Sequence, residues 1–303
     1  MRAADHSFGR TLVIFLSVLT AGCLFLAGCS KPAGDAGAEN AEETTKQPGG
    51  EWFYDSFSDV QKMAYDAFRK ASVDPFSGEP VLICDEKGNA AKIPVKDLDM
   101  VYQGFLYDHP EVFWLGQTYN YRVCSPAGEN ESADAVSVNP IPSSEAELKA
   151  QKEEFGGAAK ELLEGLEDTG SSRDKARALY DRLAAGTEYE EEALYDPSLQ
   201  YQHTAFGAVA DRKAVCDGIA LAYKYLLGRC GIRCIVIPGE SSGAAHVWNT
   251  VFWDGEWHET DLTWDTASRG NDSGQYFDLT TEEMSKDHIR EAEGIALAIP
   301  VSE

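Results

Sequence analysis

The sequence predicts an α+β protein made of two folded parts, a small α+β region over residues 51–140 and a second α+β domain over residues 141–303. Three observations predict this class. Apolar residues recur at helical spacing in several segments. Runs of aromatic and β-branched residues follow some of these segments. Near residue 255, two such runs flank Asp254-Gly255, which is a strong signal for a two-residue hairpin.

Composition limits the classes of function. Hydrophobic residues make up 43% of the 303 residues, which is enough to form a packed core. The formal net charge of −25 repels phosphate backbones, so no nucleic-acid partner is expected. The negative charge is compatible with cationic partners, but solubility outside the cell is the simpler explanation.

The first residues have the pattern of an export signal. Arg2 and Arg10 are followed by an uncharged apolar stretch, and the segment ends in Leu26-Ala27-Gly28-Cys29. The L-A-G-C run resembles the lipobox of bacterial lipoproteins. The resemblance implies that residues 1–28 are a signal peptide and that Cys29 is lipidated. An uncleaved transmembrane anchor is the alternative, but the stretch is slightly short for a span.

Either interpretation predicts a protein held at the cell membrane and facing outside the cytoplasm. The lipid interpretation makes the membrane a partner through the N-terminal lipid. Residues 29–50 are predicted to be a flexible tether, because Lys31 to Gly50 is rich in Ala, Gly, Glu and Thr and has no aromatic residue.

Element by element, the apolar spacing predicts helices over residues 57–71, 95–107, 143–166, 172–185 and 214–227. Ser144 and Glu147 form a capping-box pattern at the start of the third helix. A strand is expected in the β-favouring sequence that ends at residue 123, and further strands over residues 134–138, 232–237, 246–253 and 256–263. The acidic run 188–192 and the Gly/Ser-rich run 238–244 are expected to be loops. The segment Asp108-His109-Pro110-Glu111-Val112-Phe113-Trp114 has no assigned mechanism, and His109 is interpreted as structural.

Five cysteines remain after the export segment, so at least one thiol stays unpaired within a monomer. We expect that thiol to be Cys216, and the pairing of Cys84, Cys124, Cys230 and Cys234 stays open. Cys230 and Cys234 have no second ligand pair at zinc-site spacing, so neither a metal nor a cofactor is predicted.

Cys216 is predicted to be a nucleophile. It opens a strongly helical segment, and a helix N-terminus favours the thiolate form. Its backbone N–H is also placed to donate to an oxyanion. The adjacent Asp217 should oppose the thiolate unless it turns to solvent. Gln202 and His203 lie upstream, where a second oxyanion donor could lie, but neither residue is assigned that role.

The hairpin predicts the base and its orienting partner. With Asp254-Gly255 as a two-residue turn, Trp253 lies opposite Glu256, and His246 and Asp261 fall on one face as diagonal neighbours. His258 falls on the other face, which favours His246 as the base. Taken singly, Cys216, His246 and Asp261 would each more often be structural residues, so the prediction depends on their occurring together.

The motifs A-V-C-D-G-I-A, G-I-R-C-I-V-I-P-G, H-V-W-N and D-G-E-W-H-E-T-D-L-T-W-D resemble the core of the transglutaminase-like superfamily over about residues 175–290. The resemblance implies a papain-like core, with a cysteine-bearing helix packed on an antiparallel sheet. It also implies that Cys216 is the nucleophile, that His246 is the general base and acid, and that Asp261 orients His246.

Two functional hypotheses follow. The first is an acyl-transfer enzyme that acts through a thioester on a protein or peptide substrate, either a cysteine peptidase or amidase or a transglutaminase. The second is a catalytically silent, transglutaminase-like protein-binding module at the cell surface. No calcium-loop pattern is visible, so a calcium-activated enzyme is not expected.

Overall fold

The computed structural model describes residues 51–124, 131–166, 170–266 and 274–303. The predicted signal peptide, Cys29 and the predicted tether lie outside these residues. Among the described residues, no helix has both the length and the apolar character needed to span a bilayer.

The described chain is a mixture of helices and antiparallel sheet, which confirms the predicted α+β class. The helices are α1 (Trp52–Ser56), α2 (Asp59–Val73), α3 (Val95–Asp108), α4 (Glu145–Leu163), α5 (Ser172–Gly186), α6 (Cys216–Arg229) and α7 (Thr281–Met284). The strands are β1 (Val81–Leu82), β2 (Ile93–Pro94), β3 (Leu115–Val123), β4 (Ser132–Pro140), β5 (Glu188–Tyr189), β6 (Lys213–Ala214), β7 (Arg233–Ser241), β8 (Ala244–Trp253), β9 (Glu256–Thr260) and β10 (His288–Arg290).

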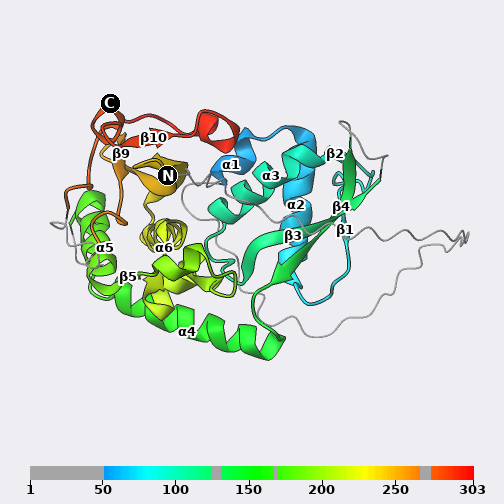
Figure 1. The fold of residues 1–303 in the computed structure, drawn as a ribbon, viewed down its shortest axis with the longest axis horizontal. Coiled ribbons are helices and arrows are strands. Elements are labelled where there is room, and N and C mark those ends of the chain that lie inside the picture. The colour runs from blue at the N-terminus through cyan, green and yellow to red at the C-terminus, as the bar shows by residue number, and fades with distance from the viewer. Residues whose placement is uncertain (1–50, 125–130, 167–169, 267–273) are drawn as a thin grey trace, which may run out of the picture. The chain divides into compact units, whose positions relative to one another are not determined.

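The first sheet lies in the N-terminal region. Strands β1, β2 and β3 all pair antiparallel with β4, and helices α2 and α3 pack beside this sheet (Figure 1). Apolar side chains at helical spacing bury one face of α2, where Ala64, Phe68 and Ala71 are buried. The helix and strand predictions for this region are confirmed.

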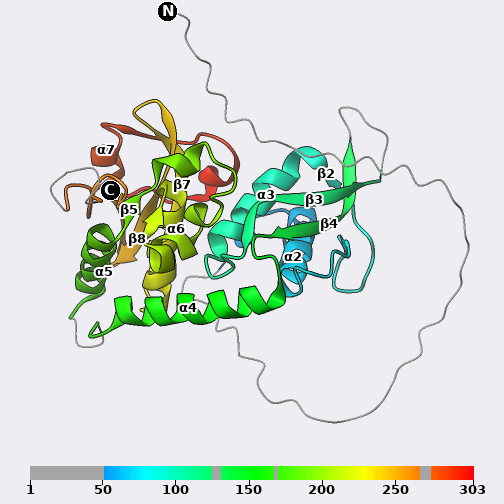
Figure 2. The ribbon, with the colours of Figure 1, turned by 60° about the horizontal axis from the view of Figure 1, so that its bottom comes forward.

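The second sheet holds the predicted site. Its order is β10-β7-β8-β9, and every pairing is antiparallel. Helix α6 packs against β7 and β8, and α5 packs against α6 (Figure 2). The cysteine-bearing helix therefore lies on an antiparallel sheet, as the sequence predicted.

Two loop predictions need correction. Residues 238–241 belong to β7, because the Gly/Ser-rich run forms a tight turn only at Ser242 and Gly243, both at positive φ. Pro238 fits in the strand although it lacks an N–H. The acidic run 188–192 contributes β5 and the start of a 3₁₀ helix, Glu191–Leu194, because β6 offers a parallel partner.

The start of α4 differs in detail from the predicted capping box. Ser144 is the N-cap and accepts the N–H of Glu147 at 3.2 Å. The Glu147 carboxylate, however, accepts from the backbone N–H of Ser143 at 2.8 Å and not from that of Ser144. The helix therefore begins where predicted, with a reciprocal bond shifted by one residue.

The described residues all belong to one compact unit. Buried side chains from both sides of residue 140, among them Phe113, Phe155 and Phe206, contact one another within one core cluster. Figures 1 and 2 show α4 running from the end of β4 toward α5, along both parts of this unit. The division at residue 140 stays a prediction.

Candidate active site

Cys216 is the first residue of α6, and the chain before it is held by backbone contacts. The N–H of Val215 donates to the carbonyl of Gln202 at 3.0 Å. Gly218 lets this segment approach, because a Cβ there would lie 2.3 Å from the same carbonyl oxygen. The Cys-Asp-Gly sequence therefore reflects close packing of residues 202–204 against the first turn of α6.

The N-terminus of α6 reaches the sheet at an open edge. Strand β9 ends at Thr260, opposite Asn249, so no strand among the described residues pairs on that side with the residues of β8 before Asn249. The backbone N–H of Val247 hydrogen-bonds the Cys216 thiol there. Val247 follows His246, so the nucleophile meets β8 next to the predicted base.

His246 and Asp261 form the predicted pair. The hairpin turns at Asp254 and Gly255, both at positive φ, and Asn249 pairs with Thr260, the register that the sequence predicted. Asp261 is the first residue beyond β9. Its Oδ2 lies 2.7 Å from Nε2 of His246, and both side chains are buried. The other ring nitrogen, Nδ1, takes no part in the hydrogen bonds found among the described residues.

His258 is on the opposite face, as predicted, where its Nδ1 lies 2.8 Å from Asp278 Oδ1. The structure therefore pairs His246 with Asp261, places Cys216 near Asp261 and Val247, and keeps His258 away from this pair. His109 contacts Glu111, with Nδ1 2.7 Å from Oε1, and is not part of this cluster.

The thiol itself differs from expectation. The helix N-terminus was predicted to favour the thiolate, yet burial raises the pKa of Cys216, and the charges of Asp217 and Asp261 raise it further. Hydrogen bonds from the backbone at Asp217 and Val247 act in the opposite direction but do not outweigh burial. These effects favour the neutral thiol of Cys216 over its thiolate, so a base would have to remove the proton before the sulfur could react.

Asp261 is hydrogen-bonded through both its carboxylate and its backbone carbonyl. Its Oδ1 accepts the N–H of Thr263 at 2.8 Å, and its backbone carbonyl accepts the hydroxyl of Tyr180 at 2.9 Å. Burial alone would raise the pKa of Asp261, but the charges and hydrogen bonds of His246 and His288 lower it well below its usual value. Asp261 is therefore an ionised acceptor that stabilises a protonated His246.

His288 is a second histidine on this carboxylate that sequence reasoning left without a role. It begins β10, and its buried Nε2 lies 3.0 Å from the Asp261 Oδ2 that also accepts from His246. Its Nδ1 lies 2.6 Å from Asp287 Oδ1. An ionised carboxylate only accepts hydrogen bonds, so both nitrogens of His288 must carry protons. Burial lowers the pKa of His288, but the two carboxylates raise it overall.

The sequence contained a signal for His288. Asp287 and His288 belong to the stretch that resembles the superfamily, but a pair near the end of the chain gave no spacing argument. Only the antiparallel pairing of β10 with β7, in which His288 lies opposite Ser241, brings His288 to the site.

Asp217 does not turn to solvent. His203 Nδ1 lies 2.9 Å from Asp217 Oδ2, and Gln117 Nε2 donates to the same oxygen at 3.0 Å. His203 Nε2 lies 3.0 Å from the carbonyl of Ala193, so both of its nitrogens face acceptors. Burial lowers the pKa of His203, but Asp217 outweighs this effect and raises that pKa to about 9. A histidinium therefore offsets the charge beside the nucleophile.

The side chain of Gln202 lies apart from this arrangement. Its Nε2 is 3.3 Å from Asp211 Oδ2, so its amide is directed to Asp211. The backbone N–H of Cys216 remains the candidate oxyanion donor, and the structure assigns no second donor among the described residues.

Trp248 supports the base from the side. Its ring stacks on the His246 ring with centroids 6.1 Å apart, and its Nε1 donates to buried Glu259 at 2.6 Å. Arg290 of β10 pairs with the same Glu259. The ring of His246 is therefore fixed by a hydrogen bond at one edge and by an anchored indole on one face.

Within the part of the chain that the structure describes, one group of side chains has ligand atoms close enough for a metal ion. Atoms of His246, Asp261 and His288 all lie within 4.8 Å of one another. The Nε2 atoms that would coordinate the ion are, however, the ones hydrogen-bonded to Asp261. Metal binding would have to replace both hydrogen bonds, so the arrangement as it stands suits proton transfer. Cys84, Cys124, Cys216 and Cys234 are free thiols.

Comparison with known proteins gives a family match for one part of the chain. A family model of the transglutaminase-like superfamily matches residues 158–262, a range that includes Cys216, His246 and Asp261 and ends before His288. The kyphoscoliosis peptidases of Mus musculus and Homo sapiens are 28% and 26% identical to this chain over 112 residues. Each alignment covers 33% of this chain and only 17% of the relative.

Among solved structures, a crystal structure of a TGase is similar to 70% of this chain over 60% of its own length, with 17% identity and a TM-score of 0.36. The sequence motifs and the family match agree on one region of the chain, the region that contains the cysteine-bearing helix and the β8–β9 hairpin. Residues 158–262 of this chain therefore match the transglutaminase-like superfamily.

Proposed function

We propose that this protein is a thiol acyl-transfer enzyme that acts on protein or peptide substrates outside the cytoplasm. The observation that carries the proposal is the 2.7 Å hydrogen bond between His246 and ionised Asp261, next to the strand position where Val247 meets the Cys216 thiol. A neutral thiol beside an oriented imidazole is the arrangement that general-base activation of a nucleophile requires.

The proposed reaction begins with proton transfer from the Cys216 Sγ to Nδ1 of His246. The sulfur attacks the carbonyl carbon of a carboxamide, and the backbone N–H of Cys216 donates to the oxyanion. The C–N bond then breaks, His246 gives its proton to the leaving nitrogen, and a thioester remains on Cys216. Asp261 stabilises the imidazolium while it holds the proton.

The second half of the reaction decides the product. Water activated by His246 releases an acid, which makes the protein a peptidase or amidase. A lysine amine attacking the same thioester forms a cross-link, which makes it a transglutaminase. Hydrolysis is the favoured outcome here, because the curated relatives that share this domain are named peptidases.

A lipid anchor at Cys29 would hold this enzyme at the cell membrane, and its substrates would then be envelope proteins or peptides. The alternative is a transglutaminase-like module that only binds proteins. The raised pKa of Cys216 favours that alternative, because such a thiol is inert unless His246 removes its proton.

Alkylation of Cys216 by iodoacetamide at pH 7.5 tests the proposal. We expect His246→Ala to slow the alkylation by about 100-fold, because the base is lost. His258→Ala is the matched control, since this histidine lies on the neighbouring strand, is bonded to Asp278, and faces away. If His246→Ala and His258→Ala label Cys216 at the wild-type rate, the enzyme proposal is wrong and the binding module remains.

A further inference from the structure

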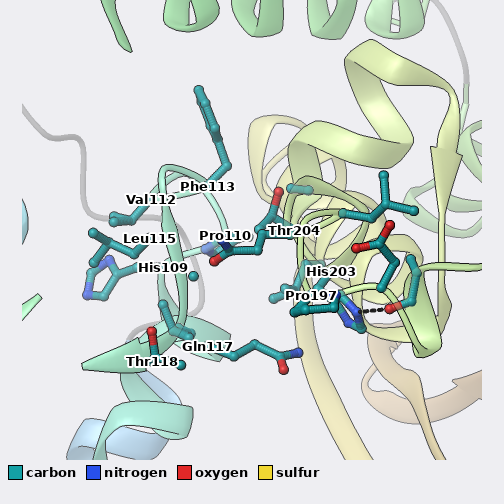
Figure 3. Close-up of a pocket in the computed structure, with 18 residues that line it drawn as sticks. His109, Pro110, Val112, Phe113, Leu115, Gln117, Thr118, Pro197, His203 and Thr204 are labelled. Atoms are coloured by element: carbon teal, nitrogen blue, oxygen red, sulfur yellow. Dashed lines mark hydrogen bonds between the residues drawn. The ribbon is translucent and has the colours of Figure 1, made fainter. Parts of the chain in front are cut away.

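A cavity of about 300 Å³ lies beside the N-terminus of α6. Figure 3 shows Val112, Leu115 and Gln117 on one side of it and Pro197 and His203 on the other. The first group comes from the end of the Asp108–Trp114 segment and from β3. The second belongs to the chain that leads into α6. The cavity therefore lies between two segments that are far apart in the sequence.

The cavity has an apolar floor and a polar mouth. Buried Val112, Phe113 and Leu221 line its interior, whereas Gln117 and Gln200 at the mouth are exposed. Two histidines of its lining are paired within the protein, His109 with Glu111 and His203 with Asp217. An apolar floor with a few polar groups at the rim suits an uncharged apolar occupant.

Two residues at the mouth of the cavity contact the residue that follows Cys216. Gln117 and His203 both line the cavity, and both bond the carboxylate of Asp217. Asp217 is the residue after Cys216, and neighbouring Cα atoms are about 3.8 Å apart. A peptide carbonyl at the Cys216 sulfur would therefore bring the side chain of an adjacent residue to this opening.

We propose that the cavity is a substrate subsite that receives a large uncharged side chain, aromatic or branched aliphatic, from a residue next to the scissile carboxamide. The inference rests on the proposed function, because it is that proposal which places a peptide at Cys216. It also gives the Asp108–Trp114 segment a role, as one wall of the subsite.

Peptide binding to a Cys216→Ala variant tests the subsite without turnover. The probes are acetyl-Phe-Gln-Gly amide, acetyl-Gly-Gln-Phe amide and acetyl-Gly-Gln-Gly amide, with binding followed by NMR through the Gly116 backbone amide and the Gln117 side-chain amide. We expect one of the phenylalanine peptides to bind at least about tenfold more tightly than the all-glycine peptide, because its ring leaves water.

Thr118→Trp should abolish this preference, because Thr118 lines the cavity and an indole there fills it. Asn120→Trp is the matched control. Thr118 and Asn120 are exposed on the same strand and each exchanges a hydrogen bond with Asn139, but Asn120 is not part of the lining. We expect Asn120→Trp to keep the preference.

Equal binding of all three peptides, or a preference that survives Thr118→Trp, would overturn the subsite. The alkylation experiment reports on the enzyme proposal separately. A protein that prefers phenylalanine peptides but shows no dependence on His246 keeps the cavity as a binding site and loses the catalytic role. A protein with His246-dependent alkylation and no preference loses only the subsite.

Discussion

His288 has a carboxylate at hydrogen-bond distance from each of its ring nitrogens, so its proton content is set by its neighbours. Its contact with Asp261 makes it a positioning residue for His246, and its positive charge offsets part of the charge on Asp261. Removing it should therefore affect the orientation of Asp261 and, through Asp261, the orientation of His246.

We expect His288→Phe to slow alkylation of Cys216 by about tenfold, the loss expected for one charge-assisted hydrogen bond. His288→Gln, whose amide can still donate to Asp261, should recover part of the rate. A slower rate in His288→Phe that His288→Gln does not recover would leave His288 a purely structural role.

His203 gives a pH dependence of stability with a defined sign. Its folded pKa of about 9 lies above the usual value of 6.5, so the folded state binds its proton more tightly than the unfolded state. The resulting stability is fully present below about pH 6.5 and is lost as the pH rises through about 9. Between these values we expect a loss on the order of 2 to 3 kcal/mol.

Urea denaturation at pH 6 and pH 9 measures this loss, and His203→Gln isolates it, because His288 has a pKa shift in the same direction. The variant should be less stable than the wild type at pH 6 and should lose less stability on going to pH 9. An unchanged slope in the variant would mean that another group titrates.

At the scale of elements, the first turn of α6 depends on Gly218. We expect Gly218→Ala to cost about 1–3 kcal/mol, because its Cβ would lie 2.3 Å from the Gln202 carbonyl. Gly156→Ala in α4 is the matched substitution in a helix where a Cβ meets nothing within 4 Å, and it should stabilise by about 0.5–1 kcal/mol. Thermal unfolding of both variants checks the opposite signs, and a Gly218→Ala protein as stable as the wild type would refute the close packing.

Local sequence patterns predicted the helices and strands of the site better than they predicted how these elements pair and pack with one another. The Asp254-Gly255 turn and the strand alternation predicted the register of β8 with β9 and the pairing of His246 with Asp261, because a hairpin is a local structure. The extension of β7 through Pro238 and the approach of β10 depend on pairings between distant segments. The effects of burial on the Cys216 thiol and the pairing of Asp217 with His203 are tertiary too, so a helix N-terminus alone gave the wrong expectation.

At the scale of the whole unit, a buried ion pair joins the N-terminal region to the cysteine-bearing helix. Asp108 at the end of α3 is buried, and its Oδ1 lies 3.6 Å from Nζ of Lys224 on α6. Its Oδ2 also accepts the backbone N–H groups of Phe53 and Tyr54 at 3.0 and 3.1 Å. The segment that sequence patterns left unexplained therefore connects α1, α3 and α6.

We expect Lys224→Met to destabilise the protein by about 3–5 kcal/mol, because Asp108 is left buried without its cation. Burial already raises the pKa of Asp108, so the variant should be relatively more stable at acid pH, where Asp108 takes up a proton. The double variant Asp108→Asn with Lys224→Met should be less damaged than the sum of the two single changes. Additive losses in a double-mutant cycle would mean that the pair contributes no coupling.

The contact between the two ends of the described chain has a consequence for biogenesis. Trp52 in α1 donates its indole N–H to the carbonyl of Ala298 at 2.8 Å. His288, in the strand β10 that precedes Ala298, contacts Asp261. A polypeptide emerging N-terminus first can complete most of its core early. Asp261, however, gains its hydrogen bond with His288 only after β10 has emerged, so this carboxylate is fully anchored later than the β8–β9 hairpin that presents it.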